Sequence, residues 1–388
     1  MNNYLYKIDK QLLKQVNTQS TDTKYSCIVY TQDYFSLKNE VLTKLGINSK
    51  TYDYPFIGAV GINLNYNQII RLAKTTTVSF ISKQSKVSAQ IDVSKKILQV
   101  DKFYSQNIYG ESCTMAIIDT GISPHLDFVM PKNRLIKFID LVNNNKAPYD
   151  DNGHGTFVTS VACGNGFTSG GKFSGVAPKC KIISIKALES SGETGAFKIL
   201  EAMQWVYDNR KKYNIKVVCM SFGSTPIDNK DPMMLGAEAL WQAGIVVVAA
   251  AGNDGPKPFT IKSPGSSNRI ITVGGLDDKR YNNLYDFKKF CVADFSSRGP
   301  VGYFYKPDLI APAINITGAS LKGGYTKMSG TSVATPMIAG VCSLMIDKYP
   351  NITPDQLKIR LVKNCKQIAF NHNAEGYGLL QLEGLFNN

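Results

Sequence analysis

Three side chains in this sequence are of the types needed for nucleophilic acyl transfer: a serine, a histidine and an aspartate. His154 lies in DDNGHGT, where a glycine on each side leaves its backbone uncrowded. Asp119 ends the apolar run CTMAIID, and Ser332 lies in MSGTSVATPMIAG at the start of a predicted helix. A serine hydroxyl attacks a carbonyl efficiently when a neighbouring base takes its proton, and a carboxylate can orient that base.

A fourth residue, Asn253 in AAAGNDG, follows a buried apolar run and Gly252. Acyl transfer passes through a tetrahedral oxyanion, which the Asn253 amide and the backbone N–H of Ser332 would stabilise. Taken singly, these residues also fit bland roles, such as a turn-forming Asp before Gly or a serine at a helix start. Taken together, they predict that His154 accepts the Ser332 proton and Asp119 orients the imidazole.

The elements that must position these side chains alternate between strands and helices. Short apolar runs, typical of strands buried on both faces, occupy residues 113–119, 180–188, 217–223, 245–253 and 270–275. Amphipathic helical patterns cover 197–213 and 233–243. This alternation predicts an α/β fold, a parallel sheet flanked by helices, with Asp119 at the strand edge where such sheets hold their sites.

The first 88 residues follow a different pattern. Strands are expected at YSCIVYTQD, YPFIGAVGINL and TTTVSFIS, and helices at 34–45 and 67–73, which together predict a small α+β unit. A polar stretch at 83–90 then reads as a linker. We therefore predict two domains, 1–88 and 89–388.

Composition excludes several classes of protein. The chain has 388 residues, of which 43% are hydrophobic and 19% charged, an ordinary balance for a folded protein. Its longest apolar run, 243–252, is far shorter than the roughly 20 residues of a membrane span. The net charge of +14 is spread along the chain. Because no basic stripe with interleaved aromatics occurs, we expect no nucleic-acid binding and interpret the charge mainly as solvation, with acidic partners or substrates as the lesser reading.

The start of the chain and its cysteines bear on its compartment. Charges at Lys7, Asp9 and Lys10 interrupt the apolar stretch that a signal peptide needs. The eight cysteines include no CxxC pair or zinc spacing, and several lie in apolar runs, so free thiols are favoured over disulfides. These features predict a cytoplasmic location, although leaderless export would give the same sequence.

Five separated segments then point to a family. IIDTGIS, NGHGTFVTSVA, AAAGND, FSSRGP and GTSVATPMIAG, over about residues 95–365, resemble the signature segments of the subtilase family, in that family's order Asp, His, Ser. The resemblance implies a subtilisin-like α/β fold and a serine endopeptidase that acts on polypeptides. Within the family, the chain looks most similar to intracellular-type bacterial enzymes that have a pro-domain and no signal peptide.

The resemblance extends to the first unit. Residues 1–88 resemble the small inhibitory and chaperone pro-domain of subtilases. In that family the unit packs on helices of the catalytic domain, and its C-terminal tail fills the cleft until it is cut. Transferred here, self-cleavage falls within Lys83–Ile91, and the protein's own pro-domain is a partner.

The resemblance also assigns substrate-binding residues. It places Ser221, Phe222 and Gly223 on a segment that pairs with substrate backbone, and Ala250, Ala251, Gly252 and Lys262 around the primary specificity pocket.

A lysine at position 262, where a small residue is common in the family, suggests a preference for an acidic residue before the scissile bond. Alternatively, Asp254 neutralises Lys262, or its side chain points to solvent. A second departure is Phe157, where the family often has a histidine; it should alter packing and leave the chemistry in place. No cofactor is required for this chemistry. The resemblance allows a structural calcium ion, but no oxygen-ligand loop follows from spacing.

Two other classes of function were weighed. A non-catalytic subtilase-fold binding module has no need of Asp119, His154, Ser332 and Asn253, all of which are intact. An α/β-hydrolase esterase would place its serine in a G-x-S-x-G turn ahead of the acid and histidine, whereas here the serine comes last.

Overall fold

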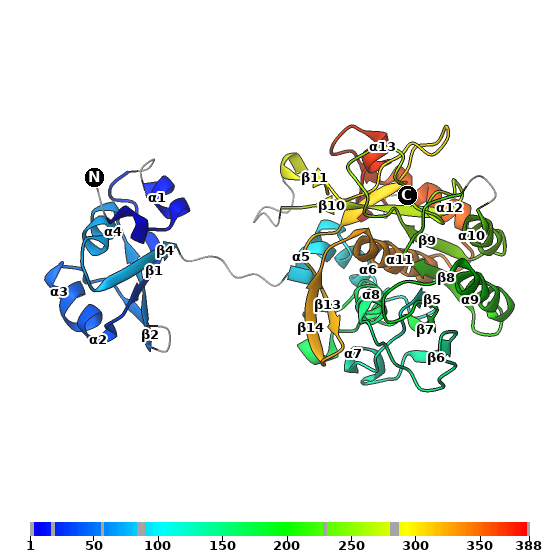
Figure 1. Ribbon diagram of the computed structural model, residues 1–388, viewed down its shortest axis with the longest axis horizontal. Coiled ribbons are helices and arrows are strands. Elements are labelled where there is room, and N and C mark those ends of the chain that lie inside the picture. The colour runs from blue at the N-terminus through cyan, green and yellow to red at the C-terminus, as the bar shows by residue number, and fades with distance from the viewer. Residues whose placement is uncertain are drawn as a thin grey trace. The chain divides into compact units, whose positions relative to one another are not determined.

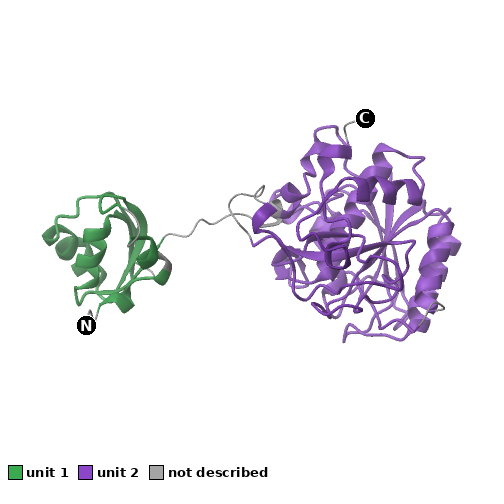
Figure 2. Cartoon of the chain, turned by 90° about the horizontal axis from the view of Figure 1, so that it is seen from above, with its two compact units in different colours: residues 1–88 green, residues 89–388 purple. Residues whose placement is uncertain are grey.

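The computed structural model of the chain describes residues 4–16, 20–55, 58–83, 90–227, 231–279 and 287–385. The chain divides into two compact units, Met1–Ser88 and Ala89–Asn388 (Figure 2). Most of the predicted linker and cleavage region, residues 84–89, lies outside the described residues.

The first unit is an α+β fold around one antiparallel sheet. Its strands, in the order β2-β3-β1-β4, are β1 (Tyr25–Thr31), β2 (Thr51–Tyr54), β3 (Ala59–Leu64) and β4 (Val78–Lys83). Its helices are α1 (Lys10–Val16), α2 (Tyr34–Ser36), α3 (Leu42–Lys44) and α4 (Tyr66–Ala73). The side chains of β1 alternate between inside and outside, so one face of the sheet forms a core with the apolar sides of the helices.

The second unit is built on a mostly parallel sheet (Figure 1). Its strands lie in the order β15-β16-β12-β10-β9-β8-β5-β7-β6, and neighbours are parallel except for β15 and β16. They are β5 (Thr114–Asp119), β6 (Leu135–Asp140), β7 (Lys181–Lys186), β8 (Ile215–Met220), β9 (Val246–Ala250), β10 (Ile271–Asp277), β12 (Leu309–Pro312), β15 (Cys365–Lys366) and β16 (Leu379–Leu380), with β11 (Cys291–Val292) antiparallel to β10.

Helices cover both faces of this sheet, and β5 and β9 are therefore buried along their whole length. α8 (His154–Cys163) and α11 (Thr331–Lys348) pack against each other, and α9 (Ala196–Asn209) packs against α10 (Pro232–Gln242). The remaining elements are α5 (Gln90–Ile97), α6 (Asp101–Tyr104), α7 (Leu126–Val129), α12 (Pro354–Lys363), α13 (His372–Glu375) and the hairpin of β13 (Ile316–Ser320) and β14 (Gly324–Met328). The central position of α11 explains its apolar sequence: it is buried nearly throughout.

The α/β fold predicted from the sequence is confirmed, and the five predicted strands of the second unit are β5, β7, β8, β9 and β10. Several elements end earlier than predicted: β8 ends at Met220 and β9 at Ala250, each three residues short, and α9 ends at Asn209, before the predicted 213. The helix α5 and the hairpin β13–β14 were not predicted. The hairpin was missed because β14 is half-exposed and lacks an apolar run.

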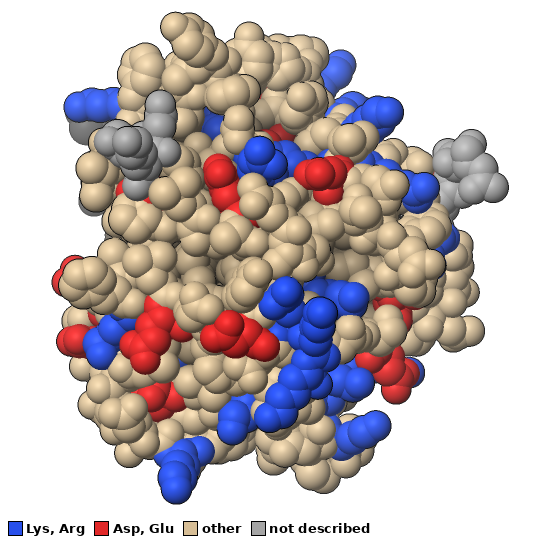
Figure 3. Space-filling model, turned by 90° about the vertical axis from the view of Figure 1, so that its right-hand side faces the viewer, with Lys and Arg blue, Asp and Glu red and all other residues tan. Residues whose placement is uncertain are grey.

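All eight cysteines are free thiols, and six of them are buried. Within the described residues, no helix combines the length and apolarity needed to cross a bilayer. Figure 3 shows one face of the molecule, on which Lys and Arg side chains lie among Asp and Glu side chains.

Phe157 illustrates how tightly α8 and β13 pack. Its ring is fully buried, and a β-carbon on Gly318 would lie 2.9 Å from it. Phe157→Ala should therefore lower the free energy of unfolding by about 3–5 kcal/mol by leaving a cavity. Thermal and urea unfolding of the full chain, carrying Ser332→Ala to prevent self-digestion, measures the loss. Phe197→Ala, at a ring that is 88% exposed, is the matched control, and an equal effect of both changes would contradict this packing role.

Candidate active site

Asp119 occupies the carboxyl end of β5, between β7 and β8 at the centre of the sheet. Its carboxylate is buried, with Oδ1 accepting the backbone N–H of Thr120 at 2.8 Å. The same oxygen lies 2.8 Å from Nδ1 of His154. The contact makes Nδ1 the donor toward Asp119, which leaves Nε2 as the ring nitrogen able to accept a proton.

Two glycines allow this contact. A β-carbon on Gly155 would lie 2.3 Å from the carbonyl oxygen of Gly121, so the first turn of α8 lies directly against the turn after β5. Gly121 has a φ of 120°, and a β-carbon there would lie 2.2 Å from the carbonyl oxygen of Tyr149. Gly121 in DTG and Gly155 in GHG are thus needed because a neighbouring backbone segment leaves no room for a side chain.

Asp150 links the same two turns through hydrogen bonds to both of them. Its Oδ1 accepts the Thr120 hydroxyl at 2.9 Å and the Gly153 N–H at 2.8 Å, and its Oδ2 accepts the Thr156 N–H at 2.9 Å. Burial alone would raise the pKa of Asp150, but hydrogen bonds from Thr156 and Gly153 outweigh it and hold that pKa below its usual value. A charged carboxylate therefore stabilises the start of α8.

The surroundings of His154 set its protonation. Burial acts to lower its pKa, but attraction to the Asp119 carboxylate, their hydrogen bond and the more distant charge of Asp150 outweigh that effect. The pKa of His154 is therefore raised. The imidazolium that forms during proton transfer is stabilised by the same two carboxylates.

Ser332 and Asn253 meet at Gly330. The serine Oγ would be 3.1 Å, and the asparagine Nδ2 3.4 Å, from a β-carbon at that glycine, whose φ is 152°. Ser332 is half-buried in the first turn of α11, and Asn253 is exposed after β9. Oδ1 of Asn253 accepts the N–H of Thr331 at 2.9 Å and its hydroxyl at 3.0 Å. Thr331 thus orients the amide so that, among the described residues, Nδ2 stays available as a donor.

Of the four predicted residues, Asp119 and His154 are in direct contact, and Ser332 and Asn253 both lie next to Gly330. The pairs are related through the packing of α8 on α11, each of which presents its side chain from its first turn. Thr331 and Asp150 were not identified from the sequence. The one available signal for Asp150 was an acidic residue just ahead of a predicted helix start.

The predicted substrate-binding residues lie beside this site. Ser221, Phe222 and Gly223 continue from the end of β8, and Ala250, Ala251 and Gly252 lead from β9 to Asn253. The Lys262 side chain lies against both segments. A β-carbon on Gly223 would lie 2.6 Å from it, and one on Gly252 would lie 2.5 Å from it.

Lys262 does not point freely into solvent. Its Nζ pairs with Asp254 Oδ2 at 2.5 Å and donates to the Thr225 hydroxyl at 3.2 Å. The side chain is only 20% exposed, against 55% for Asp254. Of the alternatives left open by the sequence, neutralisation by Asp254 matches this pairing.

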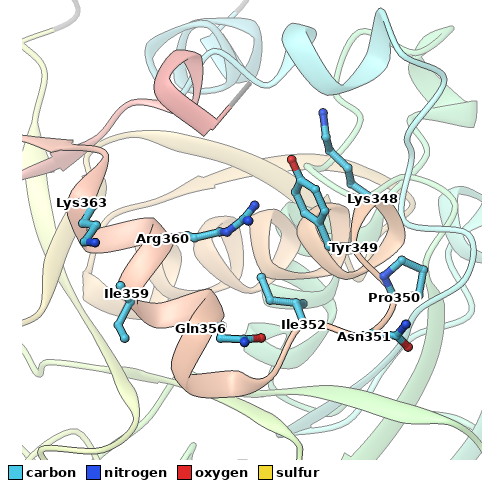
Figure 4. A pocket seen from close by; sticks show the side chains of 9 residues that line it. All are labelled: Lys348, Tyr349, Pro350, Asn351, Ile352, Gln356, Ile359, Arg360 and Lys363. Atoms are coloured by element: carbon cyan, nitrogen blue, oxygen red, sulfur yellow. The ribbon is translucent and has the colours of Figure 1, made fainter. Parts of the chain in front are cut away.

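Other candidate sites lie elsewhere. A pocket of about 600 Å³ is lined by residues of α12 and of the end of α11, including Tyr349 and Arg360 (Figure 4). Because α11 spans 18 residues, this pocket is about 25 Å from Ser332 at its start. Among the described residues, no group of three or more His, Cys, Asp or Glu could hold a metal ion. The buried carboxylates of Asp140 and Asp150 accept hydrogen bonds from the chain's own N–H and O–H groups.

A mostly parallel sheet flanked by helices, with Asp119 at the end of β5 in contact with His154, is the fold of subtilisin-like serine proteases. Solved structures agree: the S41 psychrophilic protease is similar, with a TM-score of 0.61 at 27% identity over 72% of this chain and 97% of that one. A cold-adapted subtilisin-like serine proteinase gives a TM-score of 0.56 at 28% identity over 71% of this chain and 89% of that one.

Residues 110–379 match the subtilase family, and the chain belongs to it. Serine protease AprX of Bacillus subtilis is 39% identical over 281 residues, which cover 67% of this chain and 62% of that relative. Subtilisin DY of Bacillus licheniformis is 29% identical over 290 residues, which cover 74% of this chain and 95% of that relative. The match thus spans less than two thirds of AprX and nearly all of subtilisin DY.

A substitution at Gly155 tests this geometry without changing a polar side chain. Gly155→Ala should abolish most activity, because its β-carbon would push the first turn of α8 off Gly121 and draw His154 away from Asp119. Gly195→Ala is the control, since a β-carbon there meets nothing within 4 Å. Rates of fluorophosphonate labelling and unfolding temperatures are measured on both variants. Labelling of Gly155→Ala at the wild-type rate would contradict the close approach.

Proposed function

We propose that this chain is a serine endopeptidase that cuts polypeptides through Asp119, His154 and Ser332 and is made as a self-processing precursor. The observation that carries the proposal is the 2.8 Å contact between Asp119 and His154, at the start of a helix packed on the one that begins at the serine. Family membership supports the same chemistry.

In the proposed reaction, Nε2 of His154 takes the Ser332 proton as Oγ attacks the scissile carbonyl. The amide of Asn253 and the N–H of Ser332 donate to the resulting oxyanion. The imidazolium then protonates the leaving amine as the C–N bond breaks, which leaves an acyl-serine. Water repeats the sequence and releases the carboxylic product. Only groups of the chain itself and water take part, and a structural calcium ion stays a prediction.

We propose further that the unit 1–88 is the inhibitory pro-domain and that self-cleavage removes it within Lys83–Ile91. Two properties support this: the unit is compact by itself, and it lies outside the family match, which begins at residue 110. The predicted cytoplasmic location is not tested by these features and stays a prediction.

Intact mass spectrometry with a fluorophosphonate probe tests the proposal. Wild type should lose roughly the first 83–91 residues and gain one probe per chain, whereas Ser332→Ala should remain full-length and unlabelled. An unlabelled wild type, even after limited proteolysis has removed the first unit, would contradict catalysis. In that case a non-catalytic binding module would be the better description.

The pKa of His154 fixes the acidic limb of the activity profile. Only the neutral imidazole accepts the serine proton, so activity falls as the pH drops through this raised pKa. The midpoint of kcat/KM against pH should therefore lie above about 6.5, the ordinary histidine value. Asp119→Asn should lower the labelling rate on the order of 10⁴-fold and shift the midpoint downward. A wild-type midpoint below 6.5 would contradict the raised pKa.

Lys262 and Asp254 should together set the preference at the residue before the scissile bond. We propose a mild preference for Glu that Asp254 moderates by pairing with the ammonium group. Asp254→Asn should raise the ratio of kcat/KM for Glu over Leu peptides about three- to fivefold, because a partly exposed ion pair is worth about 1 kcal/mol or less. Lys262→Ala should lower that ratio. A Leu preference unaffected by either change would exclude a role for the lysine.

A further inference from the structure

Three loops of the second unit carry six exposed aromatic side chains, here called the aromatic patch. Its members, with the exposed fraction of each, are Phe259 (74%), Tyr303 (102%), Phe304 (53%), Tyr305 (63%), Phe370 (81%) and Tyr377 (53%). Single exposed apolar residues are ordinary. Several large rings exposed on neighbouring loops are unfavourable in water, and such a patch usually marks an interaction site.

Backbone and ring contacts join these loops into one surface. The N–H of Phe259 donates to the Gly299 carbonyl at 3.3 Å, and the Gly299 N–H donates to the carbonyls of Lys306 and Asn373 at 2.9 and 2.8 Å. The Tyr305 ring centroid lies 5.2 Å from that of His372.

The rings of Tyr303, Phe304, Tyr305 and Tyr377 line one open pocket. Figure 1 shows α13, which begins at His372, with loops around it at one end of the unit.

The tip of this surface is a short hairpin. Val301 and Phe304 exchange both backbone hydrogen bonds, at 3.0 and 2.9 Å, around Gly302 and Tyr303. Gly302 takes a left-handed φ of 55°, as a two-residue hairpin requires. The turn at the tip is therefore closed by its own hydrogen bonds, and it can enter a less polar medium without breaking a ladder.

Cations outnumber carboxylates on these loops. Segments 255–260, 298–306 and 366–377 contain four cations, Lys257, Arg298, Lys306 and Lys366, and one carboxylate, Glu375. Glu375 is buried, and it accepts the N–H groups of Ile368, Ala369 and Asn371.

Lys306 is also buried, paired with Asp308, while Lys257 and Lys366 are exposed and Arg298 is half-buried. The three segments thus expose aromatic rings and positive charge and no carboxylate of their own. The exposed Asp355 of α12 lines the same pocket, together with Arg269 and Lys358.

We propose that the aromatic patch docks this protein onto an anionic lipid surface, with Tyr303 and Phe304 inserted at the headgroup level. Tyrosine and phenylalanine beside lysine are suited to a membrane interface, where the rings meet acyl chains and the cations meet lipid phosphates. A fluid surface closes around a protruding tip, whereas a rigid protein partner needs a matching pocket. Attachment of this kind is reversible, because it rests on two or three rings and a few charges.

Vesicle sedimentation tests the proposal on the full chain carrying Ser332→Ala, so that no material is lost to cleavage. Vesicles of pure phosphatidylcholine are compared with vesicles of equal parts phosphatidylcholine and phosphatidylglycerol, at low and high salt. We expect binding to the mixed vesicles, weakened by salt and by the absence of phosphatidylglycerol. Tyr303→Ser with Phe304→Ser should lower the partition coefficient about tenfold or more.

Phe197→Ser with Ile227→Ser is the matched control, because both side chains are more than 75% exposed but lie on other segments. It should leave binding unchanged, and unfolding temperatures confirm that both double variants fold. Absence of binding to the mixed vesicles would overturn the proposal, as would binding that the patch variant does not weaken. Wild-type dimers in light scattering that the patch variant abolishes, without vesicle binding, would reassign the patch to self-association.

Discussion

The site depends on one close approach between two backbone turns. The first turn of α8 lies so near the turn after β5 that only glycine fits at positions 121 and 155, and the buried Asp150 carboxylate ties both turns together. This approach brings the imidazole of His154 to Asp119. The parallel sheet supplies the rest, because β5, β8 and β9 are neighbours and end at the same edge. The chemistry of the site is therefore set by backbone packing as much as by the side chains that carry it.

Ser332 and Asn253, the proposed nucleophile and oxyanion donor, are positioned by a separate set of contacts. Thr331 uses its N–H and its hydroxyl to hold one end of the Asn253 amide, so the other end is aimed before any substrate arrives. Preorganised donors of this kind stabilise developing charge without reorganisation. Since Thr331 adjoins Ser332, one helix start positions both groups, and the long buried body of α11 anchors that start in the core.

Much of this arrangement was readable in the sequence. Fully buried parallel strands leave continuous apolar runs, so the fold class could be predicted. Glycines that permit backbone approach flank His154 and follow Asp119, and the predicted contact of these two side chains is present in the structure. Asp150, Thr331 and the pairing of Lys262 with Asp254 could not. Their roles arise from contacts between segments far apart in the chain, and local pattern does not encode which carboxylate meets which donor. The hairpin β13–β14 escaped prediction for a related reason: its Gly318 is explained only by the ring of Phe157 on another element.

The free thiols carry a consequence for how long the molecule lasts. With all eight cysteines unpaired, no covalent cross-link holds the described chain against opening. A protease that cuts unfolded chains also digests any sister molecule that transiently unfolds. If the chain has the proposed activity, its half-life in a concentrated solution is governed by how often its segments open. Selection on such an enzyme acts on the height of the unfolding barrier more than on equilibrium stability. The close packing of α8 against α11 and β13 then limits how often these segments open to cleavage by a neighbouring molecule.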